Sequence, residues 1–107
     1  MTRTPRAGTA VRGSRTGKPV MALLDLLGRR WALRVIWELR AQPLTSRALR
    51  DACGGISPTV LNDRTRELRD SGLIELAGDG YALTALGGEL FEKFAPLAAW
   101  AERWARR

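Results

Sequence analysis

Apolar side chains recur every three or four residues in two successive stretches, which is the spacing of amphipathic helices. Residues 19–28 carry a stripe formed by Val20, Leu23, Leu24 and Leu27. Residues 30–43 carry a second stripe, formed by Trp31, Val35, Ile36 and Leu39. Gly28 ends the first stretch and Pro43 ends the second, and both residue types commonly terminate helices. Two consecutive helices are therefore predicted for residues 19–43.

Two more helices are predicted on either side of the Gly54-Gly55 pair. The earlier one, over residues 45–53, can be capped by the hydroxyl group of Thr45 or Ser46. The later one begins with Ser57 as a favourable N-cap. Pro58 suits its first helical position, because the missing N–H would have no partner there. This helix is expected to run to about residue 71, where another glycine follows.

A tight β-hairpin is predicted for residues 73–84, which contain two short β-prone runs. If Asp79 and Gly80 form a two-residue turn, Leu76 lies opposite Leu83 and both fall on one face. Thr84 can then cap a last helix, with a kink before Pro96 near residues 94–95. Its apolar residues have a 4-3-4-3 spacing suited to pairing with another helix, although such a stripe is more often intramolecular core. They are Leu90, Phe94, Leu97, Ala101 and Trp104.

The predicted helix at residues 57–71 has two chemically different sides, if each residue turns the helix by about 100°. The side expected to be buried consists of Leu61, Thr65 and Leu68. The opposite side consists of Thr59, Asn62, Asp63 and Arg66, with Ser57 at the tip. Amide, hydroxyl and guanidinium groups of this kind read base edges and phosphates in the DNA major groove. The preceding helix adds candidate phosphate contacts at Ser46, Arg47 and Arg50.

An ordinary solvated helix face is the alternative interpretation of the same residues. Asp63, Glu67 and Asp70 balance the arginines at three- and four-residue spacing. Asp63 would also repel phosphate, unless it pairs with an arginine or accepts a hydrogen bond from a cytosine amine. The surrounding order of elements favours DNA binding, because three helices, a glycine turn, a helix, a hairpin and a helix make a winged helix-turn-helix. The fold class is thus mainly α with a small β-hairpin.

Charge is concentrated at the start of the chain. The 107 residues suffice for one domain with a modest core, and their formal net charge is +7. Removing five basic residues of segment 1–18 from the total of 18 leaves 13 against 11 acidic ones, so residues 19–107 are only mildly basic. The segment is predicted to be a disordered basic arm able to lie in a minor groove. Its basic residues are Arg3, Arg6, Arg12, Arg15 and Lys18.

Several other classes of function have no support in the composition. One cysteine and no histidine argue against a zinc site, and the absence of a paired nucleophile and base argues against an enzyme. We expect no cofactor, no membrane span and a cytoplasmic protein. Cys53 is either a thiol switch or, more commonly for a lone cysteine, a small buried side chain. The tryptophans either line an effector pocket between subunits or belong to the core: Trp31, Trp37, Trp100 and Trp104.

Three blocks of sequence resemble the HxlR-type winged helix-turn-helix regulators of bacteria, which are related to the MarR group. These blocks are "LLDLLGRRWALRVIWEL", "GISPTVLNDRTRELRDSGLIE" and "YALTALGGEL" with "PLAAWAERW", and the resemblance covers about residues 18–104. It implies a homodimeric transcription factor bound to double-stranded DNA at a pseudo-palindrome. The resemblance also implies a dimer interface made by the first and last helices, to which we assign Leu23, Leu27, Leu90, Phe94, Leu97, Ala101 and Trp104.

The chain departs from that family pattern at three places. Lys18 stands where many members carry a redox-sensing cysteine, and Thr65 stands where leucine is usual. The wing is only "AGDG", without the basic residues of the family's longer loop, so the basic arm is expected to replace it as a DNA contact. The short wing and Asp63 leave a second hypothesis open, a winged-helix module that binds a protein partner.

Overall fold

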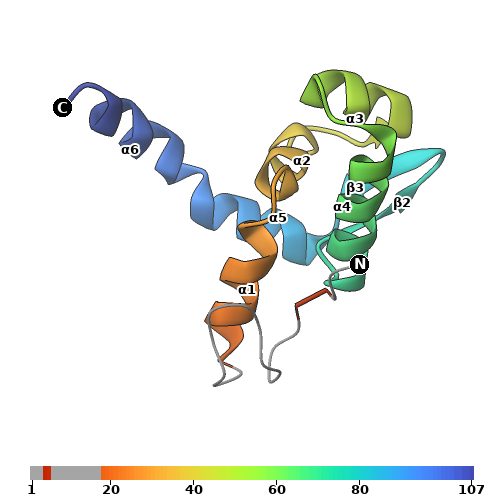
Figure 1. Ribbon diagram of the computed structural model, residues 1–107, viewed down its shortest axis with the longest axis horizontal. Helices are drawn as coiled ribbons and strands as arrows, with labels where there is room; N and C mark the ends of the chain where they lie inside the picture. Colours follow the sequence, from red (N-terminus) through yellow and green to blue (C-terminus); the bar gives the residue numbers. More distant parts are fainter. Residues whose placement is uncertain (1–3, 6–17) are drawn as a thin grey trace.

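The computed structural model describes residues 4–5 and 18–107 and shows a mainly helical molecule with a small sheet at one side (Figure 1). The helices are α1 (Pro19–Leu27), α2 (Ala32–Glu38), α3 (Ser46–Cys53), α4 (Pro58–Asp70), α5 (Ala85–Phe94) and α6 (Pro96–Ala105). The strands are β1 (Leu44–Thr45), β2 (Ile74–Ala77) and β3 (Gly80–Leu83), which form an antiparallel sheet in the order β1-β3-β2. Of the predicted basic arm, all but Thr4, Pro5 and Lys18 lies outside the described residues.

Three helices begin at the hydroxyl residues that the sequence indicates. The Thr45 Oγ1 atom accepts a hydrogen bond from the Ala48 N–H at 3.0 Å. Ser57 Oγ accepts from the Val60 N–H at 3.1 Å, and Thr84 Oγ1 accepts from the Gly87 N–H at 3.0 Å. Each bond satisfies an N–H of the first helical turn that has no partner within the helix. Of the two candidates for α3, Thr45 is therefore the cap.

The hydrophobic core gathers around α2, with contributions from every other helix except α6. Its fully buried members include Val35, Ile36, Leu49 and Leu68. On α1, however, the buried side chains are Ala22 and Leu26, whereas two of the four residues of the predicted apolar stripe are half-buried and two face outward. The outward residues of that stripe, Val20 and Leu24, are each 56% exposed.

The hairpin differs from the sequence prediction in register and in strand number. Its loop is Gly78-Asp79, so Leu76 pairs with Tyr81, whereas the predicted turn at Asp79-Gly80 and the pairing of Leu76 with Leu83 are wrong. Gly78 has φ of 60°, which suits the first loop position of a type II′ turn. Gly80 instead belongs to β3, where a Cβ atom would overlap the backbone of Leu44 in β1. The sequence analysis missed this two-residue strand β1.

The predicted interruption before Pro96 is confirmed, and it separates α5 from α6 at Ala95. Helix α5 packs beside α2 and the sheet, whereas α6 extends away from the rest of the molecule (Figure 1). None of the ten residues of α6 is buried. No described helix is long and apolar enough to cross a membrane.

Candidate nucleic-acid interface

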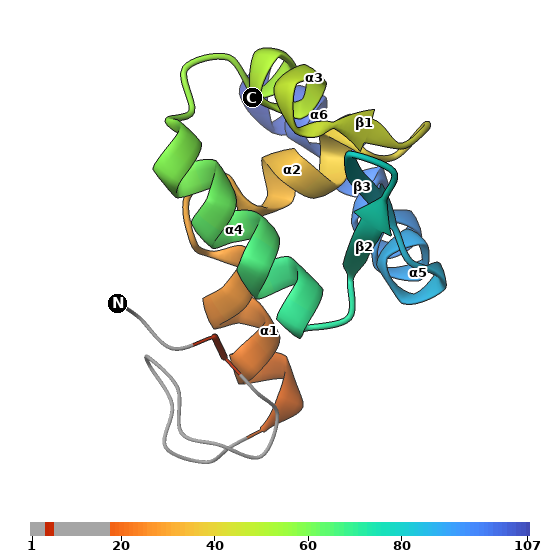
Figure 2. The same ribbon diagram turned by 90° about the vertical axis from the view of Figure 1, so that its right-hand side faces the viewer.

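Helices α3 and α4 form a helix-turn-helix around the Gly54-Gly55 pair, with the hairpin beside α4 (Figure 2). Gly54 has φ of 55° and Gly55 has φ of 86°, a left-handed backbone that other residues rarely adopt. The two glycines therefore allow the chain to reverse direction within a few residues. Ser57 then starts α4 immediately, so the short connection fixes where the helix tip is presented.

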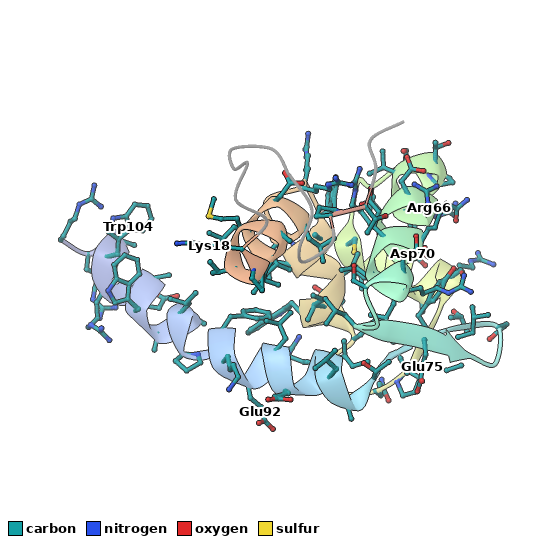
Figure 3. The ribbon with its side chains drawn as sticks, turned by 90° about the horizontal axis from the view of Figure 1, so that it is seen from below. Lys18, Arg66, Asp70, Glu75, Glu92 and Trp104 are labelled. Atoms are coloured by element: carbon teal, nitrogen blue, oxygen red, sulfur yellow. The ribbon has the colours of Figure 1, made fainter. Side chains whose placement is uncertain are left out.

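The N-terminal half of α4 presents the predicted polar side to solvent. Ser57, Thr59 and Asn62 are exposed, whereas Leu61, Thr65 and Leu68 are buried against the core. Figure 3 shows Arg66 and Asp70 on the outer side of α4, away from the Trp104 end of the molecule. The predicted division of α4 into a core side and a solvent side is thus confirmed.

A pocket of about 300 Å³ lies between α3 and α4 on this side of the molecule. Its walls are formed by Ser46, Arg47, Arg50, Pro58, Leu61 and Asn62. Arg47 and Arg50 are exposed, and neither makes a salt bridge with another described residue. Two available cations therefore stand across from an exposed amide and a helix N-terminus, a combination that suits phosphate and base contacts.

Asp63 is paired with a cation within α4. Its Oδ1 atom accepts from Arg66 Nη1 at 3.3 Å, and the two side chains are 29% and 40% exposed. The guanidinium compensates the carboxylate charge that would otherwise repel phosphate. The sequence analysis allowed Asp63 either to pair with an arginine or to accept from a cytosine amine. The structure shows the first of these, pairing with Arg66.

Thr65 is buried without leaving its hydroxyl group unsatisfied. Its Oγ1 atom donates to the Asn62 carbonyl oxygen at 3.1 Å, and the residue is 2% exposed. A threonine can bond to the preceding turn of its own helix in this way. The residue type that departs from the family pattern therefore finds its hydrogen-bond partner locally.

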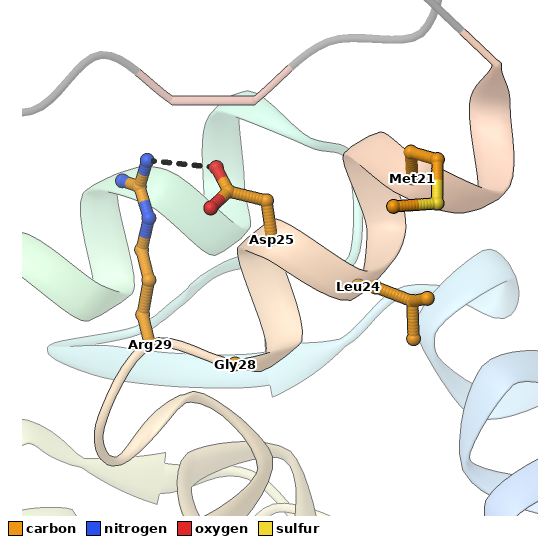
Figure 4. A pocket seen from close by; sticks show the side chains of 5 residues that line it. All are labelled: Met21, Leu24, Asp25, Gly28 and Arg29. Atoms are coloured by element: carbon orange, nitrogen blue, oxygen red, sulfur yellow. Dashed lines mark hydrogen bonds and ion pairs between the residues drawn. The ribbon is translucent and has the colours of Figure 1, made fainter. Parts of the chain in front are cut away.

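Glu67 is the residue of α4 that the sequence analysis misjudged. The alternative interpretation counted it among the acids of a solvated helix face, but the residue is 3% exposed. Its Oε2 atom accepts from Arg29 Nη1, and its Oε1 atom accepts from Arg64 Nη1, both at 2.6 Å. Arg29 Nη2 also lies 3.5 Å from Oδ2 of Asp25 in α1. Figure 4 marks this ion pair with a dashed line. A partner 38 residues away leaves no periodic signal in the sequence, which is why the pair could not be foreseen.

Cys53 is enclosed by the core and is 2% exposed. Loss of solvation raises the pKa of its thiol, although the nearby Arg34 acts in the opposite direction. A protonated, enclosed thiol reacts slowly with oxidants. The structure thus favours the interpretation of Cys53 as a small core residue over that of a thiol switch.

The tryptophans do not share one pocket. Trp37 packs against Phe91, with ring centroids 5.7 Å apart. Trp100 and Trp104 are stacked on α6 with centroids 6.1 Å apart, and they are 50% and 52% exposed. Trp31 lies at the start of α2 and packs partly against the core. The two on α6 therefore belong to an outward apolar surface, and the other two belong to the folded body.

The residues predicted to form the dimer interface also divide between the folded body and the exposed surface of α6. Leu27, Leu90 and Phe94 pack partly against the core. Leu23 is half-buried on α1. The remaining three lie exposed on α6, namely Leu97, Ala101 and Trp104.

Comparison with known proteins agrees with this fold. The family model of the HxlR-like helix-turn-helix matches residues 26–107. The crystal structure of a possible HxlR family transcriptional factor from Thermoplasma volcanium GSS1 has 30% sequence identity and a TM-score of 0.73. The match covers 84% of this chain and 87% of that one. Quinone-bound YodB from B. subtilis has 28% identity and a TM-score of 0.74, over 78% of this chain and 96% of that one.

A curated relative shows the same relationship at the level of sequence. An uncharacterised HTH-type transcriptional regulator of Methanocaldococcus jannaschii is 25% identical over 88 residues, which are 78% of this chain and 83% of that protein. A module that only binds proteins is not favoured by these matches. Because the family model covers the helix-turn-helix, the hairpin and both C-terminal helices, the chain belongs to the HxlR-like helix-turn-helix family and is a DNA-binding transcriptional regulator.

Proposed function

We propose that the protein binds a pseudo-palindromic operator sequence-specifically, as a homodimer in the cytoplasm. The observation that carries this proposal is the pocket between α3 and α4, where Arg47 and Arg50 stand opposite Asn62. Cations on the first helix of a helix-turn-helix hold the phosphate backbone, while the second helix enters the major groove. The exposure of the polar half of α4 supports its assignment as that second helix.

Within α4, the roles follow from side-chain chemistry. Asn62 is exposed and suits adenine. In the major groove, a side-chain amide can donate a hydrogen bond to adenine and accept another from it. Thr59 suits a phosphate or a thymine methyl group, and the N–H groups beside Ser57 suit a phosphate. Arg66 would turn from Asp63 to a guanine or a phosphate on binding, which exchanges one partially exposed ion pair for another.

A second copy of the chain is proposed to cover α6. This helix has ten residues and buries none of them, although its surface includes the large side chains of Leu97, Trp100 and Trp104. A helix this short is marginal in water unless its apolar face packs against something. Val20 and Leu24 add an exposed apolar surface on α1. Self-association through α1 and α6 would bury both surfaces at once and place two α4 helices at successive grooves.

The basic segment is proposed to take over the role of the wing. The loop at Gly78-Asp79 is short and its one charged residue is acidic, so it is poorly suited to phosphate. Segment 1–18 instead carries five basic residues and no acidic ones. A cationic segment next to the domain can follow the minor groove and add a salt-dependent part of the affinity.

Substitution of Asn62 tests the proposed recognition side of α4. We expect Asn62→Ala to weaken operator binding by about 1–3 kcal/mol, because one bidentate base contact is lost. Electrophoretic mobility shift or fluorescence anisotropy with operator and with bulk DNA would measure the change. Binding to bulk DNA should stay the same, since no charge is removed.

Arg69→Ala provides the matched control for the arginine on the same helix. Arg69 is exposed at the C-terminal end of α4. Arg69→Ala therefore removes the same charge as Arg66→Ala, but at the end of the helix away from the proposed groove contact. Arg66→Ala should weaken operator binding more than Arg69→Ala does. Equal losses from the two variants, together with no effect of Asn62→Ala, would contradict the proposed orientation of α4.

A further inference from the structure

We propose that the ion pair between Arg29 and Glu67 is the contact that sets the position of α4 relative to the dimer-forming helices, and so sets which half-site spacing the dimer accepts. This inference rests on the proposed function. It concerns no residue that touches DNA. Glu67 is a positioning residue, because it acts through the helix that carries Thr59, Asn62 and Arg66.

Glu67 has no freedom to turn to another partner. Both of its carboxylate oxygens are used at 2.6 Å, Oε2 by Arg29 and Oε1 by Arg64. The three side chains are almost enclosed, with 4% exposure for Glu67, 11% for Arg29 and 18% for Arg64. Charge-assisted hydrogen bonds in a poorly solvated place depend steeply on distance and angle. They therefore fix the rotation of α4 about its axis, which apolar contacts at Leu61 and Leu68 fix less sharply.

Arg29 is itself held in place by the turn between α1 and α2. Its N–H donates to the Leu26 carbonyl at 3.3 Å, and its own carbonyl accepts from the Ala32 N–H at 3.1 Å. The turn then passes through Trp31, which has φ of 78° and is the one described residue other than glycine with a positive φ. A turn that keeps a bulky residue in this unfavourable conformation is firmly determined by its surroundings.

The same guanidinium extends the connection to α1. Arg29 Nη2 lies 3.5 Å from Asp25 Oδ2, in the last turn of α1. A pocket of about 280 Å³ opens beside this pair, and Met21, Leu24 and Gly28 complete its walls (Figure 4). Leu24 belongs to the exposed apolar surface that we propose to be part of the dimer interface. The cluster therefore runs from α1 through the turn to α4.

The cluster is not arranged for maximal stability. The Nε atom of Arg64 is buried and has no hydrogen-bond partner among the described residues. Burying several charges where apolar side chains could pack is often neutral or unfavourable for stability. The cluster of charged side chains can fix the orientation of α4 through directional hydrogen bonds, which an apolar contact would not do.

The preference of the dimer for one half-site spacing distinguishes a positioning role of Glu67 from a general contribution to protein stability. For the wild-type protein, the affinity should be highest at one spacing and should fall when the operator is lengthened by about two base pairs, because the two α4 helices keep a set separation. We expect Glu67→Gln and Arg29→Gln each to reduce that preference about tenfold, while affinity for a single half-site stays within about twofold. Fluorescence anisotropy would measure the affinity for three DNA duplexes: the operator at its preferred spacing, the lengthened operator and a single half-site.

The charge change supplies a second discrimination. Glu67→Gln removes one negative charge, so a purely electrostatic effect would tighten binding to every DNA alike. Glu38→Gln is the matched control, because it makes the same substitution in the exposed pair between Arg34 and Glu38, which also spans 2.6 Å. This control should keep the wild-type spacing preference.

Two further variants keep the test decisive if Glu67→Gln fails to fold. Arg29→Lys keeps a cation beside Glu67 but loses the planar guanidinium, so it should retain more of the spacing preference than Arg29→Gln and less than the wild type. The double variant Arg29→Gln with Glu67→Gln should lose less preference than the product of the two single losses, because both variants remove the same Arg29–Glu67 contact. Unchanged spacing preference in folded Glu67→Gln, or losses that multiply in the double variant, would overturn the inference. Absence of any operator preference in the wild-type protein would instead refute the proposed function.

Discussion

At the scale of single residues, neighbouring charges on α4 contribute very differently. Arg66 and Asp63 are 40% and 29% exposed, and an ion pair of this kind contributes about 0–1 kcal/mol. The Glu67 side chain is 4% exposed, and removing one partner of a buried pair typically costs about 3–5 kcal/mol. Arg66 can therefore exchange its partner for DNA at little cost, whereas Glu67 must remain where it is. This difference decides which of the charges on α4 is free to bind.

The enclosed thiol gives a prediction at the same scale. Because burial raises the pKa of Cys53, less thiolate is present at neutral pH than for a free cysteine, and the thiolate is the reactive form. We expect labelling by a disulfide reagent to be at least about a hundredfold slower in the native protein than in denaturant, as it would require opening of the core. Oxidant treatment should leave DNA affinity unchanged. Rapid labelling that abolishes DNA binding would restore the thiol-switch interpretation.

At the scale of elements, the starts and ends of helices follow from local chemistry. Hydroxyl caps at Thr45, Ser57 and Thr84 start α3, α4 and α5, and the glycine pair at 54–55 makes the turn of the helix-turn-helix. Helix α6 is the exception, because none of its ten residues is buried and a helix this short is marginal in water without packing. The proposed dimer would supply the packing that its apolar face lacks.

Substitution on α6 tests that dependence. Leu97 and Trp104 are 58% and 52% exposed, so replacing both with serine should not disturb the core. If they are interface residues, the dimer dissociation constant should rise by at least about thirtyfold, since truncation of large interface anchors often costs 2 kcal/mol or more. Analytical ultracentrifugation would measure the change. Ala99→Ser, on another side of α6, should have no effect, and a wild-type protein that stays monomeric at high concentration would contradict the interface.

Sequence alone predicted the elements whose causes are local. The caps, the break before Pro96 and the two sides of α4 were all foreseen, because spacing and residue type determine them. The register of the hairpin was not, since either Gly78 or Gly80 could serve the turn, and the approach of β1 at Leu44 decides between them. The burial of Glu67 was also missed, because its partner Arg29 comes from a distant turn.

At the scale of the whole molecule, the charges and apolar surfaces lie in different regions. The polar half of α4 and the cations of α3 occupy one region, and α6 extends from another (Figures 1 and 3). A dimer formed through α1 and α6 would therefore leave both recognition surfaces accessible to DNA. The buried cluster around Glu67 joins α4 to the turn after α1 and to Asp25 at the end of α1.

The most direct test of specific DNA recognition is selection of bound sequences from a random pool of double-stranded DNA. The account predicts enrichment of two inverted half-sites whose centres are about one helical turn apart, with adenine at the positions read by Asn62. Asn62→Ala should select the same spacing but lose preference at those positions. A pool that remains random after repeated rounds, or that yields a single unpaired site, would contradict sequence-specific binding by a dimer.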